Sequence, residues 1–417
     1  MENCKNLLLR CLNTKIFKRK PSFELLRLYS SFIITIRHVL QFTFNSYTVH
    51  KDLYFLQALN TMSNNSFICM SAYFLANSDL KLSRFFPVII WSFYYSMGIY
   101  LCRVITKSID FDYGAFYWYL LPVSHSVYWF PAPFLFSQIL YALMVKGFKI
   151  ISFRTHLLIV ALWFILASLG TINHFKHIVF WNNGMNINVF LYFYTIGNFI
   201  KLRKIRLNKY LSILGFVLTT LLYWRCILGD FNDMLKDFPM IIRPLHSDHI
   251  FCPLAAFQTV FLILLAQEIP DIPYMGGVIN FLAESSFGIY LCHLHPLVVS
   301  QDLQSINISK YMSAPFWPCL IISCQIWLRS LIYDMINQCV LNFLVFNANW
   351  YNKFCNFVDA MFESSDDQHP AANADQSVPL EIVLEDEKSL NNANDVLVNL
   401  EEDQNEEALS PAGTSIN

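Results

Sequence analysis

The sequence predicts an all-α polytopic membrane protein with about ten transmembrane helices and a disordered cytoplasmic tail. Hydrophobic residues make up 55% of the 417 residues and charged residues only 14%, whereas soluble domains carry about 25% charged residues. The mean hydropathy is +0.40. The 12 glycines and 16 prolines are too few for a collagen-like or Pro/Gly-rich disordered chain. These observations exclude a water-soluble enzyme.

Ten apolar stretches approach the roughly twenty residues that a helix needs to cross a bilayer. They cover residues 23–44, 54–75, 85–105, 129–145, 157–172, 189–202, 211–228, 250–266, 278–299 and 315–345. The fourth and sixth are short, and residues 117–123 resemble a re-entrant or interfacial segment that leads into the fourth. The last is long enough to tilt or to extend beyond the membrane.

The net charge of −1 hides an uneven distribution. Half of the 30 acidic residues follow Tyr351, where only two lysines occur, so the rest of the chain is basic. The acidic segment is rich in Asn, Gln and Ser and lacks a sustained apolar period, which is typical of disorder. We therefore divide the chain into a basic leader (1–22), a transmembrane domain (23–348) and a disordered acidic tail (349–417).

Basic residues mark alternate connections between the predicted spans, and such residues favour the cytoplasmic side. The basic connections contain Lys5, Arg10, Lys15, Lys18, Arg19, Lys20, Lys81, Arg84, Lys146, Lys149, Arg154, Lys201, Arg203, Lys204, Arg206 and Lys209. Only the eighth-to-ninth connection, with Glu268 and Asp271, lacks this support. An even number of spans then places both termini in the cytoplasm.

Three basic residues, Arg27, Arg37 and His38, occur in the first predicted span, where burial of charge is costly and often functional. Arg27 and His38 are eleven positions apart, so they lie within about 20° of the same helix face and about 16 Å apart along the axis. Arg37 points about 100° away. The structural alternative is an interfacial arginine that snorkels to the surface, with a histidine bonded to a neighbouring carbonyl group.

Other polar groups gather in the second and ninth predicted spans. The ninth is dense for a membrane helix, with Glu284, Ser285, Ser286, Tyr290, His293 and His295. Lys81 and Arg84 precede the third span and could be topogenic charges only. The 11 cysteines form no Cys-x-x-Cys pair or zinc-spaced cluster, so we expect no metal site.

In combination, these patterns resemble the membrane acyltransferase-3 superfamily, especially its polysaccharide O-acetyltransferase-like branch. The matching features, in chain order, are Arg27 with His38, Phe67–Leu75 (FICMSAYFL), Lys81 with Arg84 before Pro87, Pro122–Phe134, Tyr192–Ile200 and Ser285–Leu297. The resemblance covers about residues 22–345. Lys81 departs from the family's first arginine at that position, which keeps the charge but loses the guanidinium fork.

The resemblance implies transfer of an acetyl or other short acyl group from acetyl-CoA or another acyl-CoA to a glycan or glycolipid hydroxyl. In that scheme His38 is the general base, and Arg27, Lys81 and Arg84 bind the donor. Tyr128, Tyr290 and His293 position the acceptor. The expected partners are acyl-CoA, the acceptor and the lipid bilayer, with no nucleic acid, no metal and no tightly bound cofactor.

Two other classes of membrane protein share this helix count and stay open at this stage. A secondary transporter also buries charges, but many transporters have inverted repeats, and the sequence has no self-similar halves. A non-catalytic receptor or scaffold would use the acidic tail as its working part. Hydrolysis of acyl-CoA separates both from an acyltransferase, because neither predicts it.

Overall fold

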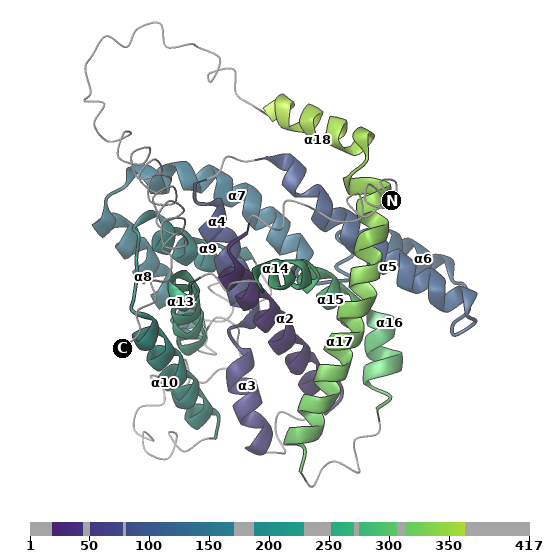
Figure 1. Ribbon diagram of the computed structural model, residues 1–417, viewed down its shortest axis with the longest axis horizontal. Coiled ribbons are helices and arrows are strands. Elements are labelled where there is room, and N and C mark those ends of the chain that lie inside the picture. Colours follow the sequence, from purple (N-terminus) through teal and green to yellow (C-terminus); the bar gives the residue numbers. More distant parts are fainter. Residues whose placement is uncertain are drawn as a thin grey trace, which may run out of the picture. The chain divides into compact units, whose positions relative to one another are not determined.

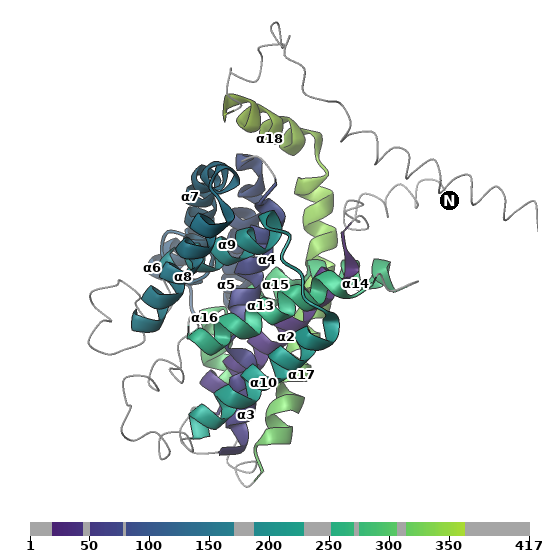
Figure 2. The same ribbon diagram turned by 90° about the vertical axis from the view of Figure 1, so that its left-hand side faces the viewer.

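The computed structural model describes residues 19–44, 51–77, 81–170, 187–228, 252–270, 275–306 and 314–362. In these ranges all regular secondary structure is helical (Figures 1 and 2), which confirms the predicted all-α class. The described ranges belong to one unit, Met1–Phe362, and Glu363–Asn417 form a second unit.

The α-helices are α2 (Pro21–Phe42), α3 (Tyr54–Asn60), α4 (Ser63–Leu75), α5 (Phe86–Ile105), α6 (Tyr113–Leu120), α7 (Pro131–Ile150), α8 (Phe153–Gly170), α9 (Ile187–Leu202), α10 (Lys209–Leu228), α13 (Pro253–Glu268), α14 (Gly276–Glu284), α15 (Ser286–His293), α16 (Pro296–Val298), α17 (Phe316–Leu341) and α18 (Asn349–Phe362). Short 3-10 helices are η2 (Lys51–Leu53) and η3 (Leu82–Arg84), and η5 (Val299–Leu303) and η7 (Asn342–Phe346) are π-helical.

Helix α2, which carries Arg27 and His38, is the central element of the first unit. Pro21 opens it at a position where a missing N–H costs nothing, and its 22 residues extend about 33 Å. It packs against α3, α4, α13, α14, α15 and α17 (Figure 1). Its buried Ser31 and Thr35 donate to carbonyl groups one turn back, so these hydroxyls do not need other partners.

Two of the predicted spans that pack against α2 are broken helices. Thr61 and Met62 separate α3 from α4 within the predicted span 54–75. The predicted span 278–299 is divided among α14, α15 and α16. Interrupted backbone at membrane depth is tolerated only where protein buries it or where it lines a cavity. Both breaks lie in helices that pack against α2, so the interior around α2 is where a cavity is to be sought.

Three described helical segments are long and apolar enough to cross a membrane: Leu82–Ile105, Lys209–Leu228 and Phe316–Phe346. Shorter apolar helices are Phe153–Leu166 and Pro253–Glu268. Large apolar side chains such as Leu143 and Leu158 are more than half exposed, and a hydrocarbon environment removes the cost of that exposure. The chain is thus an all-α membrane protein, and the count of ten spans stays a prediction.

Hydrogen bonds join connections that were predicted to lie on the same, cytoplasmic side. Lys20 Nζ donates to Gln267 O at 2.6 Å, which brings the start of α2 to the end of α13. Arg203 Nη2 donates to Ile151 O at 2.7 Å, which joins the ends of α9 and α7. The first contact gives the eighth-to-ninth connection, which lacked basic residues, a place at the basic end.

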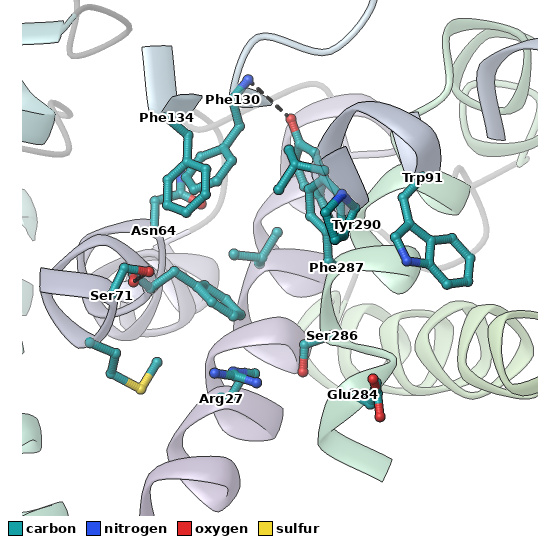
Figure 3. A pocket seen from close by; sticks show the side chains of 15 residues that line it. Arg27, Asn64, Ser71, Trp91, Phe130, Phe134, Glu284, Ser286, Phe287 and Tyr290 are labelled. Carbon is teal, nitrogen blue, oxygen red and sulfur yellow. Dashed lines mark hydrogen bonds between the residues drawn. The ribbon is translucent and has the colours of Figure 1, made fainter. Parts of the chain in front are cut away.

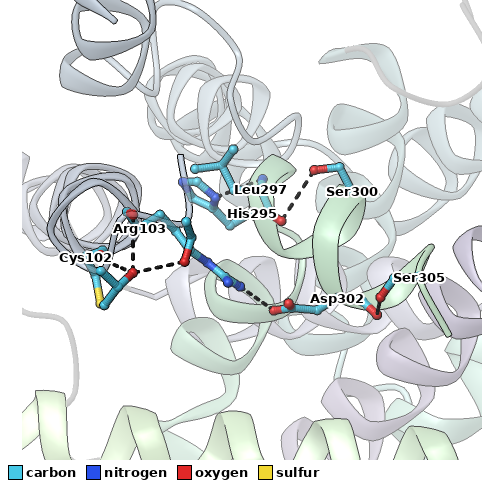
Figure 4. Close-up of polar contacts among 9 residues, drawn as sticks. Cys102, Arg103, His295, Leu297, Ser300, Asp302 and Ser305 are labelled. Atoms are coloured by element: carbon cyan, nitrogen blue, oxygen red, sulfur yellow. Dashed lines mark hydrogen bonds and ion pairs between the residues drawn. The ribbon is translucent and has the colours of Figure 1, made fainter. Parts of the chain in front are cut away.

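The alternate connections also meet each other. Thr43 Oγ1 donates to Leu303 O at 3.1 Å, and Arg103 Nη2 lies 2.6 Å from Asp302 Oδ2 (Figure 4). The ends of α2 and α5 therefore share one neighbourhood with η5. This sorting of helix ends into two groups is what alternating membrane crossings produce, and the cytoplasmic assignment of the basic group stays a prediction.

Helix α18 lies within the segment 349–417 that the sequence predicted to be disordered, so its 14 residues differ from that expectation. The difference arises from an amphipathic pattern: Trp350, Phe354 and Phe357 are exposed on one face. Asp359 accepts hydrogen bonds from the Ser83 amide at 2.9 Å and from Ser83 Oγ at 2.6 Å. This anchor ties α18 to the connection that contains Lys81 and Arg84. Residues 363–417 of the predicted tail lie outside the described residues.

Candidate active site

A cavity of about 240 Å³ lies beside α2 and is walled by the broken helices (Figure 3). Its lining is mostly apolar and aromatic, with Arg27, Ile34, Asn64, Phe67, Met70, Ser71, Pro87, Val88, Trp91, Phe130, Phe134, Glu284, Ser286, Phe287 and Tyr290. Figure 3 shows Arg27 between Ser71 on one side and Ser286 with Glu284 on the other. Small-molecule sites commonly combine an apolar wall with a few converging polar groups in this way.

His38 and His293 are in direct contact, although 255 positions separate them in the chain. Nδ1 of His38 lies 2.7 Å from Nε2 of His293, and Nδ1 of His293 lies 2.5 Å from the carbonyl oxygen of Ile289. Both rings are buried, with 6% and 1% of their surface exposed. The two imidazoles and the carbonyl group form a continuous chain of hydrogen bonds.

The chain of hydrogen bonds assigns the protons on both rings. A carbonyl oxygen only accepts, so Nδ1 of His293 carries the proton that bonds to Ile289 O. In neutral His293 the other nitrogen, Nε2, is then an acceptor, and Nδ1 of His38 donates to it. Nε2 of His38 is therefore left with its lone pair, and among the described residues it has no hydrogen-bond partner. An imidazole held in this state is suited to accept a proton.

His38 itself is not among the residues that line the cavity, but two of its neighbours are. Ile34, one turn earlier on α2, and Tyr290 both line it. The ring centroids of His38 and Tyr290 are 6.4 Å apart. Tyr290 therefore connects the lining of the cavity with the neighbourhood of the histidine pair.

Arg27 lines the cavity but is not an isolated cation. Its Nη1 lies 2.9 Å from Glu24 Oε2, and the Glu24 side chain is almost fully buried. Arg19 also approaches Glu24, at 3.7 Å. Glu24 was not identified from the sequence, although its i,i+3 spacing to Arg27 is typical of a helix ion pair. The pair fixes one edge of the guanidinium and leaves its other donors for a ligand.

Lys81 and Arg84 are not among the residues that line this cavity. They flank Ser83 in the connection before α5 and are exposed. The first cavity-lining residue after Arg84 is Pro87, three positions later. The structure therefore brings Arg27 and His38 into one neighbourhood but leaves the basic pair outside it.

The two tyrosines differ in their hydrogen bonding. Tyr290 Oη accepts a hydrogen bond from the Phe130 amide at 3.4 Å. Tyr128 is fully buried, with its ring centroid 6.2 Å from that of Tyr290, and its hydroxyl has no partner among the described residues. A buried hydroxyl without a partner is costly, so Tyr128 is available to bind a ligand group that reaches it.

Asp334 on α17 was not identified from the sequence and holds α15 in place. Its fully buried carboxylate accepts from Tyr95 Oη at 2.6 Å and from Gln338 Nε2 at 2.7 Å. It also packs against Gly288, where an added Cβ would lie 1.6 Å from Asp334 Oδ1. Glycine at 288 is therefore required for the close approach of α17 to the helix that carries Tyr290 and His293. A single acid in the apolar run 315–345 was the available signal.

His295, close to His293 in sequence, has a structural role. Its Nδ1 accepts from the Leu297 amide at 3.2 Å, which leaves Nε2 to donate to Ser96 O at 3.2 Å. Its ring also stacks on Tyr119. Both nitrogens are satisfied, so His295 caps α16 and is not a free base.

Comparison with known proteins identifies the fold that carries this site. The profile of the acyltransferase-3 family, which describes an acyltransferase domain, matches residues 20–327. Neither the curated proteins nor the solved structures gave a match. The matched region covers well over half of the chain and includes Arg27, His38 and His293. The chain belongs to the acyltransferase-3 family.

Proposed function

We propose that this membrane acyltransferase moves a short acyl group, such as acetyl, from acyl-CoA to a hydroxyl of a glycan or glycolipid. The single observation that carries the proposal is the chain His38–His293–Ile289 O, because it leaves a lone pair on Nε2 of His38. O-acyl transfer needs such a base, since the acceptor hydroxyl must lose its proton as it attacks. Family membership supports the reaction class.

The proposed reaction starts when the acceptor hydroxyl oxygen attacks the thioester carbonyl carbon. Nε2 of His38 takes the hydroxyl proton, the new ester C–O bond forms and the C–S bond breaks. The departing CoA sulfur then takes the proton from His38, which restores the neutral imidazole. While His38 is protonated, its Nδ1–H to His293 Nε2 bond is charge-assisted and therefore stronger. His293 thus orients the base and stabilises its charged form, in place of the acceptor-positioning role first expected.

The donor and the acceptor are assigned to different groups of the site. The guanidinium of Arg27, held by Glu24 at 2.9 Å, retains donors for the acyl-CoA. Lys81 and Arg84 suit phosphates that stay outside the cavity, near the start of α5. The partnerless hydroxyl of Tyr128 and the cavity-lining Tyr290 are the proposed contacts of the acceptor. The proposed orientation has both termini in the cytoplasm, where acyl-CoA is available.

The proposal is tested with the full-length protein purified in detergent. Acyl-CoA is added with and without a sugar acceptor, and thiol release is followed. We expect acyl-CoA-dependent thiol release that increases with the correct acceptor, whereas a transporter or receptor would release none. Mass analysis of glycans from cells with and without the gene identifies the acceptor, through a difference of one or more acyl groups. Absence of any acyl-CoA turnover and of any glycan mass difference would refute the proposed function.

A further inference from the structure

A second cavity, of about 350 Å³, lies at the basic end of the first unit and has a different lining. Four cations contribute to it: Lys20 before α2, Lys201 on α9, and Lys204 and Arg206 in the connection to α10. Among the described residues, no acidic side chain lines this cavity. None of the four makes an ion pair with any described residue. The cavity therefore concentrates positive charge that the described protein does not neutralise.

Two of the ammonium groups are held in defined positions. Lys20 Nζ donates to Gln267 O at 2.6 Å, and Lys201 Nζ lies 4.7 Å from the centre of the Tyr73 ring. A carbonyl oxygen and an aromatic face orient an ammonium without cancelling its charge. Each lysine keeps further N–H donors for a ligand.

Lys204 occupies a backbone conformation that glycine normally takes. Its φ is 53°, and the amide of Ile205 donates to Ile200 O at 3.0 Å, which closes the end of α9. Helices that end in this way usually carry glycine at the left-handed position, because side chains are strained there. Strained positions are often found at functional sites. A lysine at this position is consistent with a need for its charge.

Arg203, in the same connection, is a cation with a structural role. It donates to Phe148 O at 3.1 Å and to Ile151 O at 2.7 Å. Its guanidinium is thus used to join α9 to α7, and it does not line the cavity. The four lining cations have no such set of carbonyl partners, so a role in joining helices does not explain their presence in the cavity.

We propose that this cavity binds a phosphate group, carried either by CoA or by an anionic phospholipid headgroup. Charge-assisted hydrogen bonds from several cations at once are the usual basis of phosphate recognition. The start of α2 forms part of both cavities: Lys20 lines this one and Arg27 lines the first, about 10 Å apart along the helix axis. This proximity fits CoA, whose phosphates and thioester lie at opposite ends of a long flexible chain. The CoA source rests on the proposed function, and the lipid source does not.

The test measures binding to the full-length protein in detergent with three probes: CoA, 3′-dephospho-CoA and nanodiscs that contain phosphatidic acid. The variant Lys201→Gln/Lys204→Gln/Arg206→Gln removes three lining charges. Lys209→Gln is the matched control, because Lys209 is exposed at the first residue of α10, directly after this connection, but does not line the cavity. We expect the triple variant to weaken binding of one phosphate probe by at least about tenfold, and the control to leave it unchanged.

The pattern across probes identifies the source of the phosphate. Weaker CoA binding with little change for 3′-dephospho-CoA assigns the cavity to the CoA 3′-phosphate. Weaker binding of both nucleotides assigns it to the CoA pyrophosphate. Loss of phosphatidic acid binding alone assigns it to a lipid headgroup. Unchanged binding of all three probes would overturn the proposal.

Lys204→Gly separates a binding role from a structural one. Glycine relieves the left-handed strain at this position, so we expect a higher melting temperature together with weaker phosphate binding. A higher melting temperature with unchanged binding would contradict the role of Lys204. His38→Ala distinguishes this proposal from the proposed function: it should abolish transfer and leave phosphate binding intact. If the unmodified protein shows no acyl-CoA turnover, the proposed function fails while the binding results still decide this site.

Discussion

Nδ1 of His38 and Nε2 of His293 lie 2.7 Å apart and join two helices that are distant in sequence. The second nitrogen of His293 is bound to the carbonyl group of Ile289, so the direction of each hydrogen bond in the pair is fixed. The pair places an imidazole with an available lone pair near Tyr290, which lines the same cavity as Arg27. The proposed role of His38 as the general base depends on this contact.

Replacement of His293 should impair the base without removing it. In His293→Ala, His38 loses the acceptor that orients its ring and stabilises its protonated form, so we expect kcat to fall by about 10- to 100-fold. His293→Gln can keep an acceptor oxygen near Nδ1 of His38 and should retain more activity than His293→Ala. Thiol-release kinetics at saturating acyl-CoA measure both. Equal activity of His293→Ala and the unmodified protein would show that the pair has no role in the reaction.

Gly288→Ala should destabilise the site through Asp334. The added methyl group would overlap the Asp334 carboxylate, and overpacking of this kind typically costs about 1–3 kcal/mol. We expect a lower melting temperature and reduced transfer, because α15 carries Tyr290 and His293. Gly98→Ala is the matched control, since no described atom lies within 4 Å of a Cβ added there. A similar effect of both substitutions on the melting temperature would contradict the close approach of α15 and α17.

Arg27→Lys should weaken donor binding more than it slows the bound complex. Lysine keeps the charge but not the forked geometry with which arginine can hold Glu24 and a ligand together. We expect KM for acyl-CoA to rise by about tenfold, with a smaller change in kcat. Glu24→Gln, which removes the ion pair at 2.9 Å, should raise KM in the same direction. An unchanged KM in both variants would exclude Arg27 from the donor site.

Truncation should separate α18 from the acidic segment that follows it. Removal of residues 365–417 should leave membrane insertion and activity intact, because that segment lacks apolar surface to pack against the rest of the protein. Removal from residue 349 onward also deletes Asp359, whose carboxylate binds Ser83 at 2.6 Å, and should weaken acyl-CoA binding through the Lys81–Arg84 connection. Binding of acyl-CoA to the two truncated proteins decides the matter. Loss of CoA binding in the protein that lacks only residues 365–417 would show that the acidic segment contributes to the CoA site.

The sequence was sufficient to predict the helices and the residues that share one face of a helix. The hydrophobic pattern indicated an all-α membrane protein, and the eleven-residue interval placed Arg27 and His38 on one face of α2. The density of polar residues in the ninth predicted span pointed to His293. These inferences succeed because local spacing determines which side chains share a helix face.

Contacts between distant segments left no local signal. Nothing in the spacing showed that His38 meets His293 or that Asp334 requires glycine at 288, because helix packing brings these residues together. Composition also did not predict α18. Its short amphipathic sequence lies at the start of the acidic segment, and the composition of the whole segment hid it. The family resemblance grouped Lys81 and Arg84 with the donor site, but they do not line the described cavity, and their role stays a prediction.

The most direct test of the central claim is the acyl-transfer rate of His38→Ala, compared with Arg37→Gln on another face of the same helix. Loss of a general base typically lowers the rate by about 10²–10⁴-fold, so the account predicts that His38→Ala abolishes measurable transfer while expression and melting temperature stay near those of the unmodified protein. Arg37→Gln should retain most of the activity. Near-normal transfer by His38→Ala would contradict the assignment of His38 as the base.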